Sequence, residues 1–215
     1  MASQEKSLST AIEQRRSTPS FDGTPVPDED VKKILHAGLE SPSGYNLQPW
    51  RFIVVRTPEQ RRKLRAACFN QAHVEEAPLV IAACADKDGW RTDMEEMIRI
   101  GRERGMTENY AELARPSIEQ VLGNHPNLSA WLNRQVMVAF TTMMWMAEVL
   151  GYDTAAVEGF EPEKVVEALN LPLSYEVVSL LAIGRLQGPD KYYGGRFSMR
   201  RTVFDEEYGN PTKLG

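Results

Sequence analysis

The ten residues SPSGYNLQPW, Ser41–Trp50, separate an expected helix from an expected strand in this 215-residue chain. Two prolines force a loop there and stiffen the backbone that carries two amide side chains, Asn46 and Gln48. Small residues let a backbone approach a ligand closely, and amides match the polar edge of a flat heterocycle. Taken alone, the same residues suit equally well a loop that only turns the chain into a strand.

A second polar cluster, Arg15-Arg16-Ser17-Thr18, lies nearer the start of the chain. Guanidinium groups present a rigid fork of donors that matches phosphate oxygens, and short hydroxyls complete such a site. Two arginines at a helix end are more often solvated surface charge. A further basic pair, Arg200-Arg201, could however add charge to the same site. An anion site and a planar polar site in one small protein together suggest a phosphorylated aromatic cofactor.

The composition is that of a soluble globular protein, with 42% hydrophobic and 26% charged residues. The length favours one domain, residues 1–215, with a sizeable core. A net charge of −5 argues against general binding of nucleic acid or of an anionic membrane surface. The two cysteines lack metal-type spacing and Met1–Ser9 lacks the apolar core of a signal peptide, so we expect a cytoplasmic protein.

Hydrophobic periodicity predicts an α+β fold. The first helix is expected to be capped by Ser9 and to run into Arg15-Arg16 before Pro19 ends it. The helix over 130–150 is apolar on most sides, which is typical of a core helix or of a dimer axis. Other helices are expected over 28–39 and 57–67, and buried strands over 52–55, 79–85, 154–157 and 177–183.

Two segments differ from this pattern. Residues 90–126 carry many charges and no strand signal, so we expect about two helices that form an insertion or lid, more mobile than the core. Residues 188–215 are basic, aromatic and rich in glycine at their start. A tail of this kind frays alone, so we expect a C-terminal arm that lies along a neighbouring surface.

Glu158-Gly159-Phe160 follows the short strand over 154–157. A glycine there lets the backbone approach a ligand, although a helix cap before the next helix is an equally good interpretation. The three histidines are far apart and lack metal-type spacing, so we expect no metal site. A GxGxxG fingerprint is absent, so a nicotinamide would not be held in a Rossmann crevice.

Taken together, these segments resemble the nitroreductase family of FMN-dependent oxidoreductases. The resemblance implies a mixed central sheet flanked by helices, in an intertwined homodimer with two FMN sites at its interface. Each part alone is unspecific, but the combination is fairly specific and covers most of the chain. It consists of Arg15-Arg16-Ser17, Pro42–Trp50, Asn70, the helix around Arg134-Gln135, Gly151-Tyr152-Asp153 leading to Glu158–Phe160, and the arginine-rich tail.

The same resemblance implies roles for individual residues. The FMN phosphate and ribityl chain would be bound by Arg15, Arg16 and Ser17, joined by Arg201 and Arg200 from the tail. The segment that reaches across the dimer to the other subunit's flavin would consist of Pro42, Ser43, Gly44 and Asn46. The isoalloxazine ring would meet Asn70 at its pyrimidine edge and Glu158 and Gly159 at its reactive edge, with the Gly159 N–H near N5.

The chain departs from the family pattern in three places. Many members have a lysine where this chain has Pro19, and a second lysine near Asn70 is replaced by His73. A serine of the loop is replaced by Gly44. A positive or donor group near flavin N1 and O2 stabilises the reduced ring. Here His73 serves in that role, or Arg16 turns inward, or the flavin has a lower reduction potential than in related proteins.

The activity implied by the resemblance is hydride transfer from NADH or NADPH to the flavin and then to an electron-poor acceptor, with ping-pong kinetics. The acceptor would be a small nitroaromatic, quinone or enone that contacts the lid through Met94, Met97, Met106 or Tyr110. Alternatives are a specialised enzyme of the same fold (dehalogenase-like or flavin-consuming) and a flavin-binding protein without turnover. A helical interaction domain without ligand is a third.

Replacing His73 by alanine is expected to make the bound flavin harder to reduce. The substitution removes the donor that stabilises negative charge on the reduced ring. The midpoint potential of the bound flavin, compared between the wild type and His73→Ala, tests this directly. An unchanged potential would rule out the role of His73.

Overall fold

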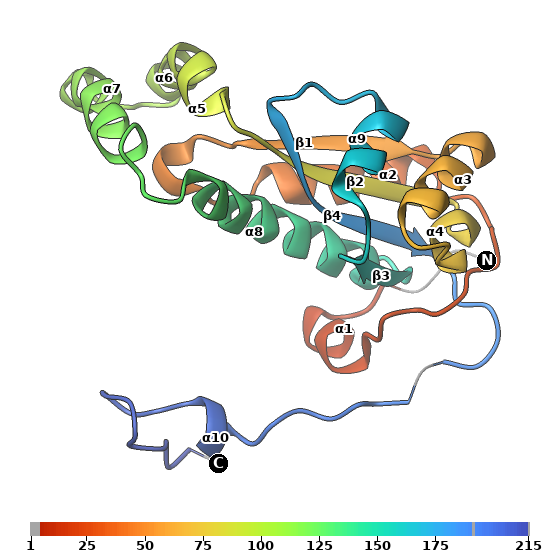
Figure 1. Ribbon diagram of the computed structural model, residues 1–215. Coiled ribbons are helices and arrows are strands. Elements are labelled where there is room, and N and C mark those ends of the chain that lie inside the picture. Colours follow the sequence, from red (N-terminus) through yellow and green to blue (C-terminus); the bar gives the residue numbers. More distant parts are fainter. Residues whose placement is uncertain (1–4, 191, 215) are drawn as a thin grey trace.

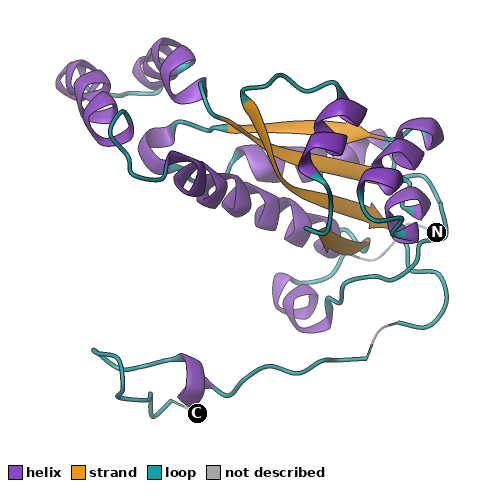
Figure 2. Ribbon diagram, viewed as in Figure 1, coloured by secondary structure: helices purple, strands orange, loops and turns teal. Residues whose placement is uncertain are grey.

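The computed structural model describes residues 5–190 and 192–214. One four-stranded sheet forms its centre, with strands in the order β1 (Trp50–Val55), β2 (Leu79–Asp86), β4 (Tyr175–Gly184) and β3 (Asp153–Val157). All three strand pairs are antiparallel. The parallel component is a single bridge between Ser17 and Thr154 at the β3 edge. The α+β class with helices around a central sheet is confirmed (Figures 1 and 2).

Helices cover both faces of the sheet (Figure 1). The first begins after Ser7, whose hydroxyl accepts the Thr10 N–H at 3.2 Å, and it ends before Arg15. The expected cap at Ser9 and the helical Arg15-Arg16 are therefore wrong. The α-helices are α1 (Leu8–Gln14), α2 (Asp28–Leu39), α3 (Pro58–Ala67), α4 (Ala72–Glu76), α5 (Gly89–Thr92), α6 (Met94–Glu103), α7 (Glu108–Leu122), α8 (Leu128–Val149), α9 (Pro162–Leu169) and α10 (Met199–Thr202).

Two hydrophobic cores lie on the two faces of the sheet, and strand alternation decides which side chain enters each. Ile81 and Leu181 point to the face covered by α2 and α8, and Ala82 and Leu180 point to the face covered by α3, α4 and α9. The central strand β2 is buried over its whole length. This burial explains why its sequence is continuously apolar rather than alternating.

The segment expected to be a lid forms the short α5 and the longer α6 and α7, which lie apart from the sheet (Figure 1). These helices enclose a third cluster of their own, which includes Met94 and Met97 and receives Leu47 from the loop before β1. The lid is therefore packed internally. Met94 is fully buried, whereas Met97 lines a cavity together with Asn46 and Gln48 of the loop. Arg51 on β1 forms ion pairs with Asp86 at 2.9 Å and with Asp93 at the start of α6.

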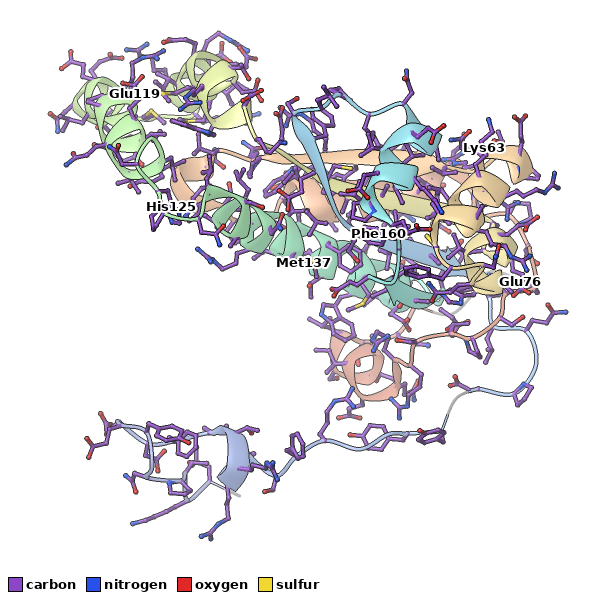
Figure 3. The ribbon with its side chains drawn as sticks, in the orientation of Figure 1. Lys63, Glu76, Glu119, His125, Met137 and Phe160 are labelled. Atoms are coloured by element: carbon purple, nitrogen blue, oxygen red, sulfur yellow. The ribbon has the colours of Figure 1, made fainter. Side chains whose placement is uncertain are left out.

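The C-terminal arm extends away from the body and carries α10 near its far end (Figure 1). Its side chains stand clear of the helices that cover the sheet (Figure 3). Several large apolar groups are exposed there, among them Tyr192, Phe197 and Tyr208. Residues 191 and 215 of the expected arm lie outside the described residues. Length and apolar character sufficient for a bilayer crossing are not combined in any helix of the described chain.

One carboxyl group is buried under the last turns of α8. Glu148 is 2% exposed, and its Oε1 atom accepts a hydrogen bond of 2.7 Å from the Thr154 hydroxyl. Burial raises the pKa of Glu148 to about 7, because a charged carboxylate loses its hydration there, and the Thr154 bond opposes the rise only in part.

This raised pKa predicts how stability varies with pH. The native state keeps a proton that the unfolded chain releases between pH 4.5 and about 7, so burial of Glu148 costs stability as pH rises through that window. Glu148→Gln cannot ionise. Its free energy of unfolding relative to the wild type should therefore increase by roughly 2–3 kcal/mol between acidic and alkaline pH. Urea unfolding of both proteins at pH 5 and pH 8 measures the difference, and an equal difference at both pH values would contradict it.

Candidate functional site

A cavity of about 330 Å³ lies between the segment after α1 and the start of the arm. The Arg16 guanidinium stacks on the Tyr193 ring at 4.4 Å from its centroid, and the Arg196 guanidinium lies at 5.6 Å from the same centroid. Stacking on one ring holds both cations close together. The lining residues are Arg15, Arg16, Ser17, Tyr192, Tyr193, Gly194 and Arg196.

We call the cavity lined by these residues the anion pocket. Strand β3 holds the part of its wall that comes from residues 15–17. Ser17 pairs with Thr154, and the Thr18 N–H donates to the Thr154 carbonyl at 3.0 Å. Arg16 is oriented by its own backbone, since its Nη1 atom donates to the carbonyls of Glu13 and Arg15 at 2.8 Å. The segment is thus held as an added edge of the sheet.

Arg15 carries an unsatisfied donor. Its Nη1 atom is buried and has no hydrogen-bond partner among the described residues. Buried donors are nearly always paired, and an arginine can only donate, so an acceptor from a water molecule or a ligand would satisfy this atom. A phosphate oxygen is an acceptor whose geometry fits the guanidinium fork.

Within this chain the cavity is lined by Arg196 and not by Arg200 or Arg201, whose contact with FMN stays a prediction. Arg200 and Arg201 are exposed on α10, and Arg201 stacks on Phe197 at 4.3 Å. An extended chain advances about 3.3 Å per residue, so four or five residues beyond Arg196 it has left the pocket. Within one chain, Arg196 takes the place predicted for Arg200 and Arg201. The sequence offered three similar arginines, and only the stack on Tyr193 separates them.

The loop from Ser41 to Trp50 adopts an unusual backbone. Tyr45, Asn46 and Gln48 have φ values of 56°, 56° and 47°, a conformation that non-glycine residues rarely adopt. Inside the loop, the Ser43 hydroxyl accepts the Gln48 N–H at 3.0 Å. Pro42 and Asn46 are exposed, whereas Ser43 and Gly44 are half-buried.

Helix α8 holds this loop in place. The Gln135 Oε1 atom accepts the Gly44 N–H at 2.8 Å, and the Ser41 hydroxyl donates to Thr142 at 2.9 Å. Gly44 lies against Trp131 so closely that a Cβ would come within 2.6 Å of the ring. The glycine seen as a lost hydroxyl in the sequence is therefore required by packing. Sequence analysis did not assign Gln135 or Trp131 to the site.

The third group of predicted residues meets at the end of β3. Phe69 and Asn70 both have positive φ values, 52° and 58°, and form the turn between α3 and α4. The Gln71 Nε2 atom donates to the Gly159 carbonyl at 2.7 Å and thereby joins this turn to Glu158-Gly159. Asn70, Glu158 and Gly159 are exposed, as is 64% of the Phe69 side chain. Sequence analysis missed Gln71, because an isolated glutamine carries no motif.

We call the group formed by Phe69, Asn70, Gln71 and Glu158-Gly159 the ring cluster. His73 and Phe160 lie beside it. His73 is half-buried on α4, one turn after Asn70. Phe160 follows Gly159 at the turn between β3 and α9 (Figure 3). Residues 70–73 and 158–160, which are far apart in the sequence, thus lie together where β3 ends.

One chain brings together only part of the predicted site. The anion pocket at Thr154 and the ring cluster beyond Val157 are joined by β3, which spans roughly 13 Å from Thr154 to Glu158. The loop, in contrast, is held at Gln135, and α8 rises roughly 20 Å from there to Glu148 beside the anion pocket. Gly44 is therefore remote from the anion pocket of the same chain, whereas Pro42 lies nearer to it, in a cavity with Met146 and Val149 of α8.

Comparisons with known proteins identify the family of this chain. The family model described as "Nitroreductase family" matches residues 12–185. A protein of Thermus thermophilus named NADH dehydrogenase is 34% identical over 194 residues, which is 90% of this chain and 93% of that protein. A Staphylococcus epidermidis protein, by name an NAD(P)H nitroreductase, is 32% identical and aligns over 74% of this chain and 76% of its own.

A solved structure resembles the whole fold. It is a protein of Exiguobacterium sibiricum named as a nitroreductase, in complex with FMN. The TM-score is 0.87 with 26% identity, and the match covers 96% of this chain and 100% of that one.

Replacing Gly44 by alanine is expected to lower stability by about 1–3 kcal/mol, because the new Cβ overlaps the Trp131 ring and the loop or the ring must shift. Chemical denaturation measures the loss. Gly194→Ala is the matched control, since a Cβ there meets no atom within 4 Å. Equal stabilities of the two variants would show that the loop does not depend on this contact.

Proposed function

This chain belongs to the nitroreductase family, and on that premise we propose that it is an FMN-dependent oxidoreductase that uses NADH or NADPH. The acceptor we propose is a small electron-poor molecule, a nitroaromatic, a quinone or an enone. The single observation that carries the proposal is that Arg15, whose Nη1 atom is buried and unpartnered, lines a cavity together with further arginines. In a chain with a net charge of −5, such a local concentration of cations needs a ligand to explain it.

The anion pocket would hold the FMN phosphate. Arg15, Arg16 and Arg196 supply charge-assisted donors, and Ser17 supplies a hydroxyl. The isoalloxazine ring would lie at the ring cluster, with Asn70 at its polar edge and Glu158-Gly159 at its reactive edge. The span of roughly 13 Å along β3 suits a ligand with a phosphate at one end and a flat ring at the other.

The functional unit we propose is a homodimer with FMN at its interface. Gly44 lies far from the anion pocket of its own chain, which favours a dimer in which Pro42, Ser43, Gly44 and Asn46 complete the site of a second copy. The half-buried side of α8 and the exposed apolar side chains of the arm are the surfaces that such a copy would cover.

The hydride chemistry is supplied by the flavin when it is bound. The protein binds the phosphate, orients the ring and shapes the space above it. Phe69 presents an exposed aromatic face beside Gly159, which suits stacking of a flat nicotinamide or acceptor. No side chain of this chain is needed as acid or base, since solvent can supply the proton. Donor and acceptor would bind in turn at the same place, which gives ping-pong kinetics.

Spectroscopy of the purified protein tests this function. A yellow protein that NADH or NADPH bleaches without oxygen, and that menadione reoxidises, is an active oxidoreductase. Initial rates at several donor and acceptor concentrations should then give parallel double-reciprocal lines. A yellow protein that neither donor bleaches is a flavin-binding protein without turnover, and a colourless protein that does not bind FMN is neither. A protein that consumes its flavin during turnover is a specialised member of the fold.

Substitutions of the tail arginines test which of them binds the phosphate: Arg196, which lines the pocket, or Arg200 and Arg201, which the sequence predicted. Arg196→Gln should weaken FMN binding by about tenfold, which is the loss of one charge-assisted contact. The double variant Arg200→Gln/Arg201→Gln should bind FMN within about twofold of the wild type. Quenching of flavin fluorescence gives both dissociation constants. The opposite order of the two effects would return the phosphate contact to Arg200 and Arg201.

A further inference from the structure

Glu148 lies on the inner side of the segment that forms the anion pocket. The carboxyl group is buried, and its hydrogen-bond donor is the hydroxyl of Thr154. The backbone of the same Thr154 holds the segment, since it pairs with Ser17 and accepts the Thr18 N–H. One residue therefore contacts the buried carboxyl group through its side chain and the phosphate-binding segment through its main chain.

Charged groups face Glu148 from the elements packed on it. Lys6 comes from the segment before α1, which is tied to α8 by a bond of 2.8 Å from the Lys6 N–H to the Val149 carbonyl. Arg15 comes from the end of α1, and Asp153 from the start of β3. Lys6 and Arg15 favour the ionised form of the Glu148 carboxyl, whereas Asp153 disfavours it.

None of these groups neutralises Glu148 by direct contact. Among the described residues, no cation lies within 4.0 Å of its carboxyl oxygens. A buried carboxyl without an ion partner is held more easily as the neutral acid. The unpaired Nη1 atom of Arg15 belongs to the same neighbourhood. Two incompletely satisfied groups, one cationic and one acidic, thus lie near the Ser17–Thr154 pairing.

We propose that Glu148 is a positioning residue that couples binding of a phosphate group in the anion pocket to protonation of its own carboxyl. As the neutral acid, Glu148 leaves the charge of Arg15 available to the phosphate. As a carboxylate, it attracts Arg15 inward and adds negative charge behind the pocket. This inference rests on the proposed assignment of the pocket to the FMN phosphate.

The coupling has a definite sign. A bound phosphate is negative and disfavours a second negative charge nearby, so binding raises the pKa of Glu148 and takes up a proton near neutral pH. Affinity for the phosphate group must then fall as pH rises through the titration of Glu148. Ionisation of the free FMN phosphate, with a pKa near 6, acts in the opposite direction but equally on every variant.

Titration of the apoprotein with FMN at pH 6, 7 and 8 tests the coupling. Between pH 6 and pH 8, the dissociation constant of the wild type should rise about three- to tenfold more than that of Glu148→Gln. Calorimetry in two buffers of different ionisation enthalpy should show a greater proton uptake by the wild type than by the variant. Equal pH dependence and equal proton uptake would overturn the proposal.

Two controls separate this role from a structural one. Glu176→Gln changes another carboxyl group, which accepts hydrogen bonds from Ser129 and Asn133 of α8 far from the pocket. This variant should keep the wild-type pH dependence of FMN binding. Riboflavin lacks the phosphate, so its binding should show no difference between the wild type and Glu148→Gln. A difference that persists with riboflavin would contradict coupling through the phosphate.

Isotope-edited infrared spectroscopy of the wild type keeps the test independent of any variant's folding. Addition of FMN at pH 7 should increase the signal of protonated glutamate. Failure of this inference is distinguishable from failure of the proposed function. A protein that binds FMN without this signal lacks only the coupling, whereas a protein that does not bind FMN at all lacks the function.

Discussion

Helix α8 imposes the constraint on which the arrangement of the site depends. Its 22 residues lie against one face of the sheet, and its packing there is set by fully buried residues such as Phe140 and Met143. The loop at Gly44 is attached to the first half of α8 through Gln135. Glu148 lies near the C-terminal end of α8, beside the anion pocket. Because a helix is rigid at this length, the loop and the pocket of one chain stay apart. In the homodimer that we propose, each site would take these two segments from different copies.

Charge in this protein is organised locally. The chain is acidic overall, yet Arg15, Arg16 and Arg196 meet at one small cavity, two of them on the ring of Tyr193. On the lid, by contrast, most arginines are paired with glutamates, as Arg99 is with Glu96 and Glu103. Paired surface charges contribute little to stability or binding, since water screens them. The buried, unpaired guanidinium atom of Arg15 is different, because it belongs to a residue that lines a cavity with further arginines.

The helices and strands were predicted correctly where neighbouring residues in the sequence carry the pattern that determines them. The apolar run of β2 and the helical spacing of Val31 and Ile34 follow from burial periodicity, which neighbouring residues express by themselves. The cap of α1 was placed at Ser9 instead of Ser7, because several hydroxyls compete there and only geometry selects one. The sequence of the lid did not reveal its own hydrophobic cluster, which joins Trp90, Met94 and Ile118 from three helices. That packing depends on contacts between elements, which periodicity within one element does not reveal.

By itself, the sequence determined the fold class, the strands and principal helices, the family, and the segments that carry polar groups of the right kind. Residue type and spacing are enough for these, since they depend on local propensity and burial. Only the tertiary structure decided which of three tail arginines reaches Arg16, that Gln71 joins Asn70 to Gly159, and that Glu148 lies behind Arg15. These contacts join residues far apart in the chain. Their geometry follows from how the helices pack on the sheet, which no short stretch of sequence encodes.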